Sequence, residues 1–377
     1  MSHSPQPTSL RKHSRPREHQ PTAPSRTSSA LRQVVALGAA AIGTLALSAC
    51  VGPPAAEWTN TAAAECPIET SDSTGTIRIG YLGSPAGDLY LYDRGVAEAC
   101  LPNVDVQWTR LPTGQDIVKA FASGSIDVAS LGSTPAAKAL TGPLNLNVSV
   151  TRVDSATKSG EALVAKDAES IEDLKDKTIA TPFSSTAHYS LLNALRFAGL
   201  DPKTDVKITN ISPDNLPAAW NSDAIDAAYV WEPTLSEIKN NGKTLTDSAE
   251  VAEQGAPSYN LTLADQPWQQ ANPELLRTWT TLQNWAVEQY NTNKEDFTKA
   301  IAAQAEISED SARTQLQGSG FFTGEEQPQA AKELRKALLN TAEFLHSEGD
   351  VDTPADQSHY DQAVAYALAR ENDHAEN

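Results

Sequence analysis

The sequence predicts an α/β fold of two lobes, and three observations lead to this fold class. Apolar runs typical of buried strands alternate with helical periodicities, which indicates βαβ units and a largely parallel sheet. This alternation occurs twice along the chain, and helical patterns then continue to the end. A chain of 377 residues is also longer than one hydrophobic core usually supports, so we expect two lobes.

The first set of elements is expected in residues 76–155. Strands are identified by apolar runs or by alternation of apolar and polar residues, and helices by a period near 3.6. The predicted elements are strands at 76–82, 104–108 and 126–131 and helices at 86–101 and 117–122. A further helix is expected to begin at Ser133-Thr134-Pro135, because proline is favourable in the first turn of a helix.

The second set of elements is expected in residues 156–256. The predicted elements are strands at 162–165, 178–181, 206–208 and 225–230 and helices at 187–198 and 216–220. A short helix is expected to start at Ser170, with Asp173 in its first turn. Gly199 follows the predicted 187–198 helix at the position where glycine is preferred, so we expect that helix to end there.

The C-terminal part is expected to be helical after residue 260. Thr323 and Glu326 have the spacing of a capping box. Thr353-Pro354, followed by Asp356, marks another expected helix start. We therefore assign the C-terminal helices to the first lobe, and expect the chain to cross between the lobes near residues 155 and 257. The expected division is 1–49 signal peptide, 50–75 lipidated cysteine and tether, 76–155 and 257–377 first lobe, and 156–256 second lobe.

The N-terminal segment has the organisation of an export signal. Six Lys or Arg residues and one Glu precede an uncharged stretch at 34–47, which is shorter than the roughly 20 residues needed to span a bilayer. The sequence Leu47-Ser48-Ala49-Cys50 resembles the lipobox of bacterial lipoproteins. The resemblance implies cleavage before Cys50, a lipid on Cys50 and a place at the outer face of the cell membrane. The alternative is a cytosolic chain with a disordered, alanine-rich start.

The net charge excludes some classes of partner. The chain carries a formal charge of −19, and the expected signal peptide holds six of its basic residues and one acidic residue. The exported part is therefore still more acidic, which argues against nucleic acid or an anionic membrane surface as the partner.

The cysteines and histidines predict a disulfide and no metal site. With Cys50 assigned to the lipobox, Cys66 and Cys100 remain as a pair in an exported protein, where disulfides persist. The alternative is two unpaired thiols. The chain has no CxxC motif, and its seven His are scattered, so neither a metal nor a cofactor is expected.

Hydroxyl side chains stand at two strand-to-helix turns. Ser133 and Thr134 follow a strand in the first lobe, and Ser184-Ser185-Thr186 follow one in the second. In open α/β sheets, ligands bind beyond the carboxyl ends of the strands. A helix N-terminus there presents free N–H groups and a partial positive charge, which suits an anion without any Arg. The alternative interpretation is ordinary N-capping, for which Ser and Thr are preferred.

The chain also resembles a known family, the taurine-binding proteins of bacterial ABC importers, within the wider sulfonate and nitrate group of substrate-binding proteins. The similarity covers roughly residues 76–346 in order. The segments that carry it are SLGSTP (130–135), SGEALV (159–164), TPFSSTAHYSLL (181–192), DAAYVWEP (226–233), LTDSAEV (245–251) and GAP (255–257). The resemblance implies a two-lobed type II periplasmic-binding-protein fold, with a ligand cleft between the lobes, and delivery of a small sulfonate to ABC permease subunits.

The resemblance also implies a set of ligand-binding residues. Glu161 corresponds to an acid near the ligand amine, and Trp231 to a pocket wall whose indole face also suits an ammonium group. His188 lies beside the second hydroxyl pair, although a packing or capping role is the alternative. The alternative for Glu161 is a solvated charge at the edge of a strand. The alternative for Trp231 is a packing role in the hydrophobic core. The anion-binding positions that the resemblance implies are Ser133, Thr134, Ser185 and Thr186.

Two positions depart from the family pattern. After GAP the family usually places an acid that meets the amine, whereas this chain has Asn260. Leu82 replaces a polar residue in the first strand-turn, and Asp88, a little further on, is a candidate for the missing charge. These changes leave open whether the ligand is taurine, another alkanesulfonate or a different small anion such as nitrate.

The function predicted from the sequence is a binding protein without catalytic chemistry. Enzymes that make pyrimidine precursors share the lobe architecture, but this sequence shows no base in a triad-like spacing. A sensor or adhesion role is a third class, and no signalling domain follows the lobes.

Overall fold

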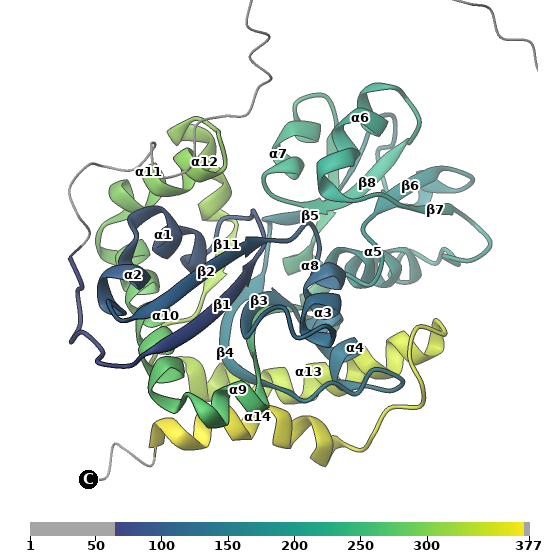
Figure 1. Cartoon of the computed structure of the whole chain (residues 1–377). Helices are drawn as coiled ribbons and strands as arrows, with labels where there is room; N and C mark the ends of the chain where they lie inside the picture. Colours follow the sequence, from purple (N-terminus) through teal and green to yellow (C-terminus); the bar gives the residue numbers. More distant parts are fainter. Residues whose placement is uncertain (1–64, 373–377) are drawn as a thin grey trace, which may run out of the picture. The chain divides into compact units, whose positions relative to one another are not determined.

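The computed structural model describes residues 65–372, and its strands form two sheets. The expected signal peptide at 1–49 and the lipidation site Cys50 lie outside the described residues. The first sheet has the strand order β11-β4-β10-β3-β1-β2, and the second has the order β7-β6-β8-β5-β9. Each sheet carries helices, so the predicted α/β class with two lobes is confirmed (Figure 1).

The first sheet combines parallel and antiparallel strands. Its strands are β1 (Gly75–Tyr81), β2 (Val104–Arg110), β3 (Val128–Gly132), β4 (Val148–Thr157), β10 (Tyr259–Asp265) and β11 (Ser319–Phe321). β1 pairs in parallel with β2 and β3, whereas β10 runs antiparallel to β3 and β4, and β11 antiparallel to β4. The expectation of a largely parallel sheet is therefore wrong for this lobe.

Helices cover both faces of the first sheet, because its strands are apolar on both sides. One hydrophobic cluster joins the sheet to α3, α4, α13 and α14, and the other joins it to α1, α2, α10, α11 and α12. The helices of this lobe are α1 (Gly87–Arg94), α2 (Val96–Cys100), α3 (Gly114–Ala122), α4 (Ser133–Leu140), α9 (Gln266–Ala271), α10 (Pro273–Thr292), α11 (Lys294–Gln304), α12 (Glu309–Gln317), α13 (Gln327–Ser347) and α14 (Gln357–Asn372).

The second sheet repeats this plan on a smaller scale. β6 pairs in parallel with β7 and β8, while β5 runs antiparallel to β8 and β9. One face packs on α6 and α7, and the other on α5. Its elements are β5 (Glu161–Ala165), η2 (Glu172–Leu174), β6 (Thr178–Thr181), α5 (Thr186–Phe197), β7 (Lys207–Asn210), η3 (Pro213–Asn215), α6 (Leu216–Asn221), β8 (Ala227–Trp231), α7 (Thr234–Lys239), β9 (Lys243–Asp247) and α8 (Ser248–Glu253).

The chain passes twice between the sheets. It leaves the first sheet at the end of β4, Thr157, and enters the second at Glu161. It returns between the end of α8 and Tyr259, the first residue of β10. Since β4 and β10 pair with each other, the two passages lie close together.

Several local expectations are corrected by the structure. The helix predicted over 86–101 is two helices, because Gly95 adopts a left-handed conformation with φ 60° and ends α1. The Glu326 carboxylate does accept from the Thr323 N–H at 2.7 Å, but α13 begins only at Gln327. The Asp356 carboxylate, rather than Thr353, receives the His359 N–H at the start of α14.

The segment before β1 is fastened to the first lobe by a disulfide. Cys66 is bonded to Cys100, the last residue of α2, across a sequence separation of 34. The Ser71 N–H also donates to the Cys100 carbonyl at 2.9 Å. Cys100 is fully buried, so this cross-link is part of the core of the lobe.

Replacing Cys66 and Cys100 together by Ser should lower the free energy of unfolding by about 3–4 kcal/mol, the chain-entropy value for a loop of this length. Urea unfolding with and without reductant measures the effect. Reductant should destabilise the wild-type protein and leave the double variant unchanged. Reaction of both thiols with a labelling reagent in the native, unreduced protein would contradict the cross-link.

Candidate ligand-binding cleft

A cavity of about 90 Å³ lies between the two lobes and is lined by residues from both. Five residues singled out in the sequence line it: Glu161, Ser185, Thr186, Trp231 and Asn260. Ser133, Thr134 and His188 are not part of its lining. The structure therefore brings together most of the predicted binding residues, in a space reached from the carboxyl ends of β3 and β6.

Two helix N-termini meet at this cavity. Gly132 is the N-cap of α4 and Ser185 is the N-cap of α5, and both line the cavity. A Cβ built on Gly132 would lie 2.7 Å from Thr186 Cγ2, so the close approach of the helices requires glycine. The first N–H groups of a helix have no partner within it and give this end a partial positive charge, so the positive ends of both helices border the same cavity.

The hydroxyl side chains are mostly engaged by the protein itself. Ser185 Oγ accepts from the His188 N–H at 3.1 Å and donates to the Pro182 carbonyl at 2.5 Å. Ser133 Oγ accepts from the Tyr259 N–H at 3.2 Å. The capping interpretation is therefore correct for Ser185, and the backbone N–H groups are the donors that remain for an anion.

Thr134 is different, because its hydroxyl is fully buried and has no hydrogen-bond partner among the described residues. It occupies the first turn of α4 but does not line the cavity. An unpaired buried hydroxyl costs roughly 1–3 kcal/mol, so this turn is not optimised for stability alone.

Glu161 is a buried carboxylate held by hydroxyl groups. Thr186 Oγ1 donates to its Oε2 at 2.5 Å, and Ser248 Oγ and Ser190 Oγ donate to its Oε1 at 2.7 and 3.4 Å. Burial raises the pKa of Glu161, and the three hydroxyl bonds oppose that shift. None of these partners is basic, so the charge of Glu161 is solvated but not neutralised, which is the environment that a ligand cation would complete.

Trp231 stands directly opposite Glu161 in the β5–β8 ladder. It is half-buried, contacts the hydrophobic clusters on both faces of the second sheet, and also lines the cavity. Both interpretations offered for Trp231 therefore hold, since one side chain packs on the core and walls the cleft.

His188 packs outside the cavity. Its Nδ1 accepts from the Ser184 N–H at 3.2 Å, and its ring stacks on Phe183 with centroids 4.7 Å apart. Burial lowers the pKa of His188 to about 4, so the ring is neutral at physiological pH. The structure supports the packing role for His188 and not ligand contact.

Asn260, which departs from the family pattern, and Asp88, the candidate for the missing charge, lie at adjoining cavities. Asn260 lines the ligand cleft and donates to Ser155 Oγ at 3.1 Å. Asp88 lines a second cavity of about 50 Å³, which Asn260 also lines. Burial, reinforced by the charge of Asp154, raises the pKa of Asp88 to about 7.

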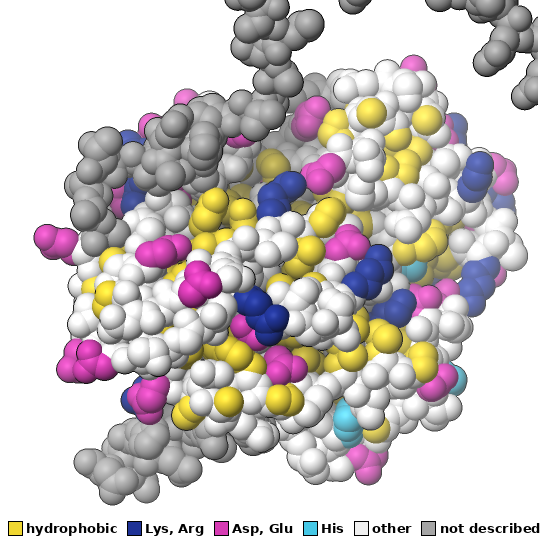
Figure 2. All heavy atoms as spheres, in the orientation of Figure 1, with side chains coloured by type: hydrophobic (Ala, Val, Ile, Leu, Met, Phe, Trp, Pro, Cys, Tyr) yellow, Lys and Arg dark blue, Asp and Glu magenta, His cyan; other side chains and the backbone are white. Residues whose placement is uncertain are grey.

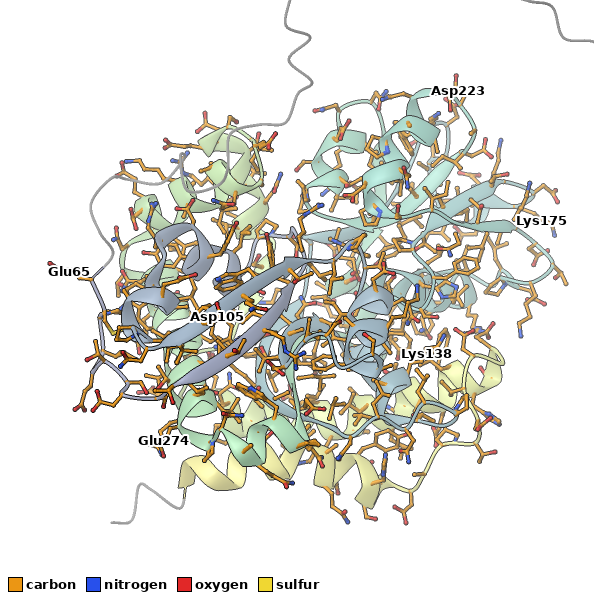
Figure 3. All side chains as sticks on the ribbon, in the orientation of Figure 1. Glu65, Asp105, Lys138, Lys175, Asp223 and Glu274 are labelled. Atoms are coloured by element: carbon orange, nitrogen blue, oxygen red, sulfur yellow. A yellow bond between two sulfur atoms is a disulfide. The ribbon has the colours of Figure 1, made fainter. Side chains whose placement is uncertain are left out.

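Several residues at the cleft escaped the sequence interpretation. Lys158 and Glu232 line it. Each is the first residue after a strand, β4 for Lys158 and β8 for Glu232. Ser184, at φ 54°, links the lobes: Lys138 of α4, which is labelled in Figure 3, donates from Nζ to the Ser184 Oγ at 3.2 Å, and that Oγ donates to Asp350 at 3.0 Å. These contacts join segments far apart in sequence, and no local pattern reveals them.

Between residues 65 and 372, no group of three or more His, Cys, Asp or Glu is placed to hold a metal ion. In the same range, no helix is long and apolar enough to cross a membrane. On the face shown in Figure 2, acidic side chains lie among basic ones.

Comparison with known proteins identifies similar chains. Residues 101–305 match the NMT1-like family. The chain is 34% identical over 267 residues to the taurine-binding periplasmic protein of Escherichia coli (strain K12), an alignment that covers 69% of this chain and 82% of that protein.

Solved structures share the fold. The alkanesulfonate-binding protein SsuA from Xanthomonas axonopodis pv. citri, bound to MOPS, superposes with a TM-score of 0.67 at 19% identity, over 78% of this chain and 99% of that one. The desulfurization enzyme DszB superposes with a TM-score of 0.57 at 14% identity, over 79% and 99% of the two chains. At these identities the likeness concerns the fold alone, and it confirms the periplasmic-binding-protein architecture.

Asp88 should make stability depend on pH. Its pKa rises from 3.8 to about 7 on folding, so the folded state binds the proton more tightly. Asp88 therefore contributes stability that is complete below about pH 4 and is lost as pH rises to 7. We expect the stability of the wild type relative to Asp88→Asn to fall by an amount on the order of 3–4 kcal/mol across that window.

Urea unfolding at several pH values measures this difference. Asp105→Asn, a change at an exposed carboxyl, is the matched control and should leave the wild-type curve unaltered. Parallel curves for wild type and Asp88→Asn would show that Asp88 does not titrate in this window.

Proposed function

Since this chain belongs to the NMT1-like family and to the sulfonate-binding group of ABC substrate-binding proteins, we propose that its ligand is taurine or a related small sulfonate, which it delivers to a membrane permease. The observation that supports a sulfonate most strongly is the meeting of the α4 and α5 N-termini at the cleft. Gly132 and Thr186 bring the N-terminal ends of α4 and α5, one from each lobe, to the same cavity. A sulfonate is weakly basic and offers three oxygens, so neutral donors and helix dipoles suffice to bind it.

Glu161 supports a ligand that also carries a positive charge. Its carboxylate is buried close to the proposed anion-binding end of the cleft. Thr186 links the two, because it lines the cleft and its hydroxyl donates to Glu161. An ammonium group would neutralise Glu161 and rest against the face of Trp231. Taurine combines these two charges in a short molecule, whereas nitrate or an amine-free alkanesulfonate would leave Glu161 unpaired.

The proposed mode of action is closure of the lobes on the ligand. The binding groups are divided between the lobes, so a ligand that touches both favours the closed arrangement. We infer binding and release without chemistry, in line with the names of the taurine- and alkanesulfonate-binding proteins to which the chain is similar.

Calorimetric titration of the purified protein tests the ligand class. Taurine should bind more tightly than ethanesulfonate, sulfate or nitrate. Glu161→Gln should weaken taurine binding about 10–100-fold, because a charge-assisted hydrogen bond contributes about 1.5–3 kcal/mol. The same change should affect ethanesulfonate much less, because that ligand has no ammonium group.

Glu232→Gln is the matched control, since Glu232 is another buried acid of the second lobe that lines the cleft. It should retain the wild-type preference for taurine over ethanesulfonate. Absence of binding heat for every sulfonate would contradict the proposed function, and turnover of a sulfonate would favour an enzyme on this fold.

We also propose that a lipid on Cys50 holds the protein at the extracytoplasmic face of the cell membrane, close to its permease. The support is the lipobox-like sequence that ends at Cys50. An anchor of this kind raises the local concentration of the binding protein at the permease.

Metabolic labelling with a fatty acid in a bacterial host tests the anchor. The wild type should take up label and fractionate with membranes, and Cys50→Ala should do neither. The Cys66→Ser, Cys100→Ser double variant should keep the label, because its lipobox is intact. Equal labelling of Cys50→Ala would rule out lipidation at Cys50.

A further inference from the structure

A second cavity, of about 50 Å³, adjoins the ligand cleft within the first lobe. The two cavities share five lining residues: Leu82, Ser84, Pro85, Ser155 and Asn260. On β3 the cleft reaches Gly132, whereas the second cavity reaches Ser130. Two residues along a strand span about 7 Å, so the second cavity extends the cleft into the first lobe by roughly that distance.

Two buried acceptors with unused capacity line this second cavity. Asp88 is 4% exposed, and the hydrogen bond that its carboxylate accepts comes from the Leu89 N–H, at 2.9 Å. Gln283 of α10 is also 4% exposed, and its Oε1 has no partner among the described residues, while its Nε2 donates to Thr262 Oγ1 at 2.8 Å. Buried acceptors of this kind are normally satisfied, so a group with several hydrogen-bond donors would fit this cavity.

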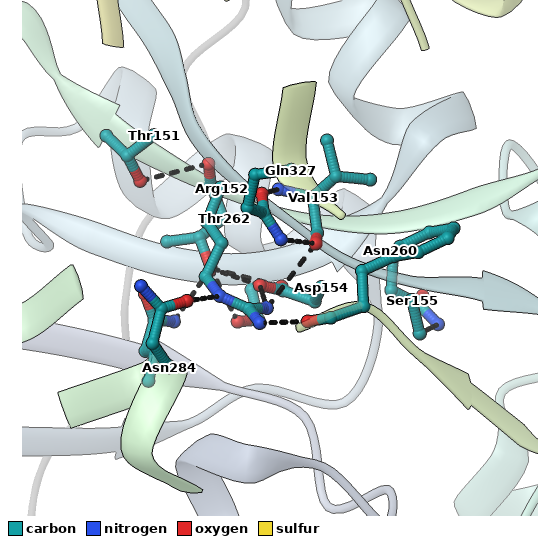
Figure 4. Close-up of polar contacts among 12 residues, drawn as sticks. Thr151, Arg152, Val153, Asp154, Ser155, Asn260, Thr262, Asn284 and Gln327 are labelled. Carbon is teal, nitrogen blue, oxygen red and sulfur yellow. Dashed lines mark hydrogen bonds and ion pairs between the residues drawn. The ribbon is translucent and has the colours of Figure 1, made fainter. Parts of the chain in front are cut away.

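The basic residue at this cavity is already neutralised. Arg152 Nη1 pairs with Asp154 at 3.0 Å, and its Nε donates to Asn284 Oδ1 at 3.0 Å (Figure 4). Arg152 Nη2 donates to the Phe322 carbonyl at 2.5 Å. One arginine is thus matched by one aspartate, and Asp88 remains as the uncompensated carboxyl of the cavity.

We propose that the second cavity is a subsite for the cationic end of a ligand longer than taurine. This inference rests on the proposed function, because it places the sulfonate at the α4 and α5 N-termini. An ammonium group would donate to the Asp88 carboxylate, which has no cationic partner, and to Gln283 Oε1, which has no hydrogen-bond partner among the described residues. The ligand class is the aminoalkanesulfonates in which more than two carbons separate the charges, since Glu161 serves the shorter ones at the cleft.

Such a ligand would stabilise the ionised form of Asp88. Burial and Asp154 disfavour the ionised form in the free protein, and an ammonium group would reverse that preference. A cationic ligand would thus favour the ionised form of Asp88.

Titration with two matched ligands tests the subsite. The ligands are 4-aminobutanesulfonate and butanesulfonate, which differ only in the amine. In the wild type the amine should improve affinity at least tenfold. In Asp88→Asn this ratio of affinities should fall to near one, and in Gln283→Leu it should decrease several-fold. Thermal unfolding of each variant shows that it is folded before it is titrated.

The Glu161→Gln variant distinguishes the role of Glu161 from that of Asp88. It should reduce the preference for taurine over ethanesulfonate and leave the preference for 4-aminobutanesulfonate over butanesulfonate largely intact. An unchanged ratio in Asp88→Asn would overturn the subsite while the proposed function stands, and would mean that the cavity holds water only. Failure of the wild type to bind any sulfonate would overturn the proposed function itself.

Discussion

The close approach of two helix N-termini is the constraint on which the cleft depends. Gly132 precedes α4 in one lobe and Thr186 opens α5 in the other, and the space between them excludes any Cβ on Gly132. Everything else at the site is arranged around this meeting point. In each sheet, one of the two helices follows the carboxyl end of a strand. β4 and β10 pair with each other, and the chain passes between the lobes after β4 and before β10. A protein of formal charge −19 can therefore present a locally positive site.

The contacts that join the lobes elsewhere are both apolar and polar. Tyr189 of α5, which is buried, packs on Phe344 of α13 with ring centroids 4.9 Å apart. Arg110 and Asp214 pair across the cleft at 3.2 Å, with both side chains about half exposed, and such exposed pairs contribute at most about 1 kcal/mol. The Lys138–Ser184–Asp350 contacts lie deeper, because Ser184 is buried. We propose that such contacts and a bound ligand together favour the closed arrangement of the lobes. The buried acids Glu161 and Asp88 add a further bias, because their charges are best satisfied when a cationic ligand is present.

The sequence predicted the parts of this structure that are encoded locally. Apolar periodicity located the parallel strands, and the hydroxyl-rich turns located both helix starts. β4 and β10 were missed even though Val148–Thr157 and Tyr259–Asp265 alternate partly as strands do, because their partners are distant in sequence. Capping by Ser185 is local and was one of the two interpretations that the sequence allowed. The bond from Thr186 to Glu161, and the lack of a partner for Thr134 among the described residues, depend on tertiary packing and were not predictable.

A crystal structure of the protein grown with taurine tests the central claim most directly. The account predicts that the sulfonate oxygens accept hydrogen bonds from backbone N–H groups in the first turns of both α4 and α5, with the ammonium group on Glu161. A sulfonate bound to Lys158 at the edge of the cleft, or a taurine molecule turned so that its ammonium faces Gly132 and Thr186, would contradict it.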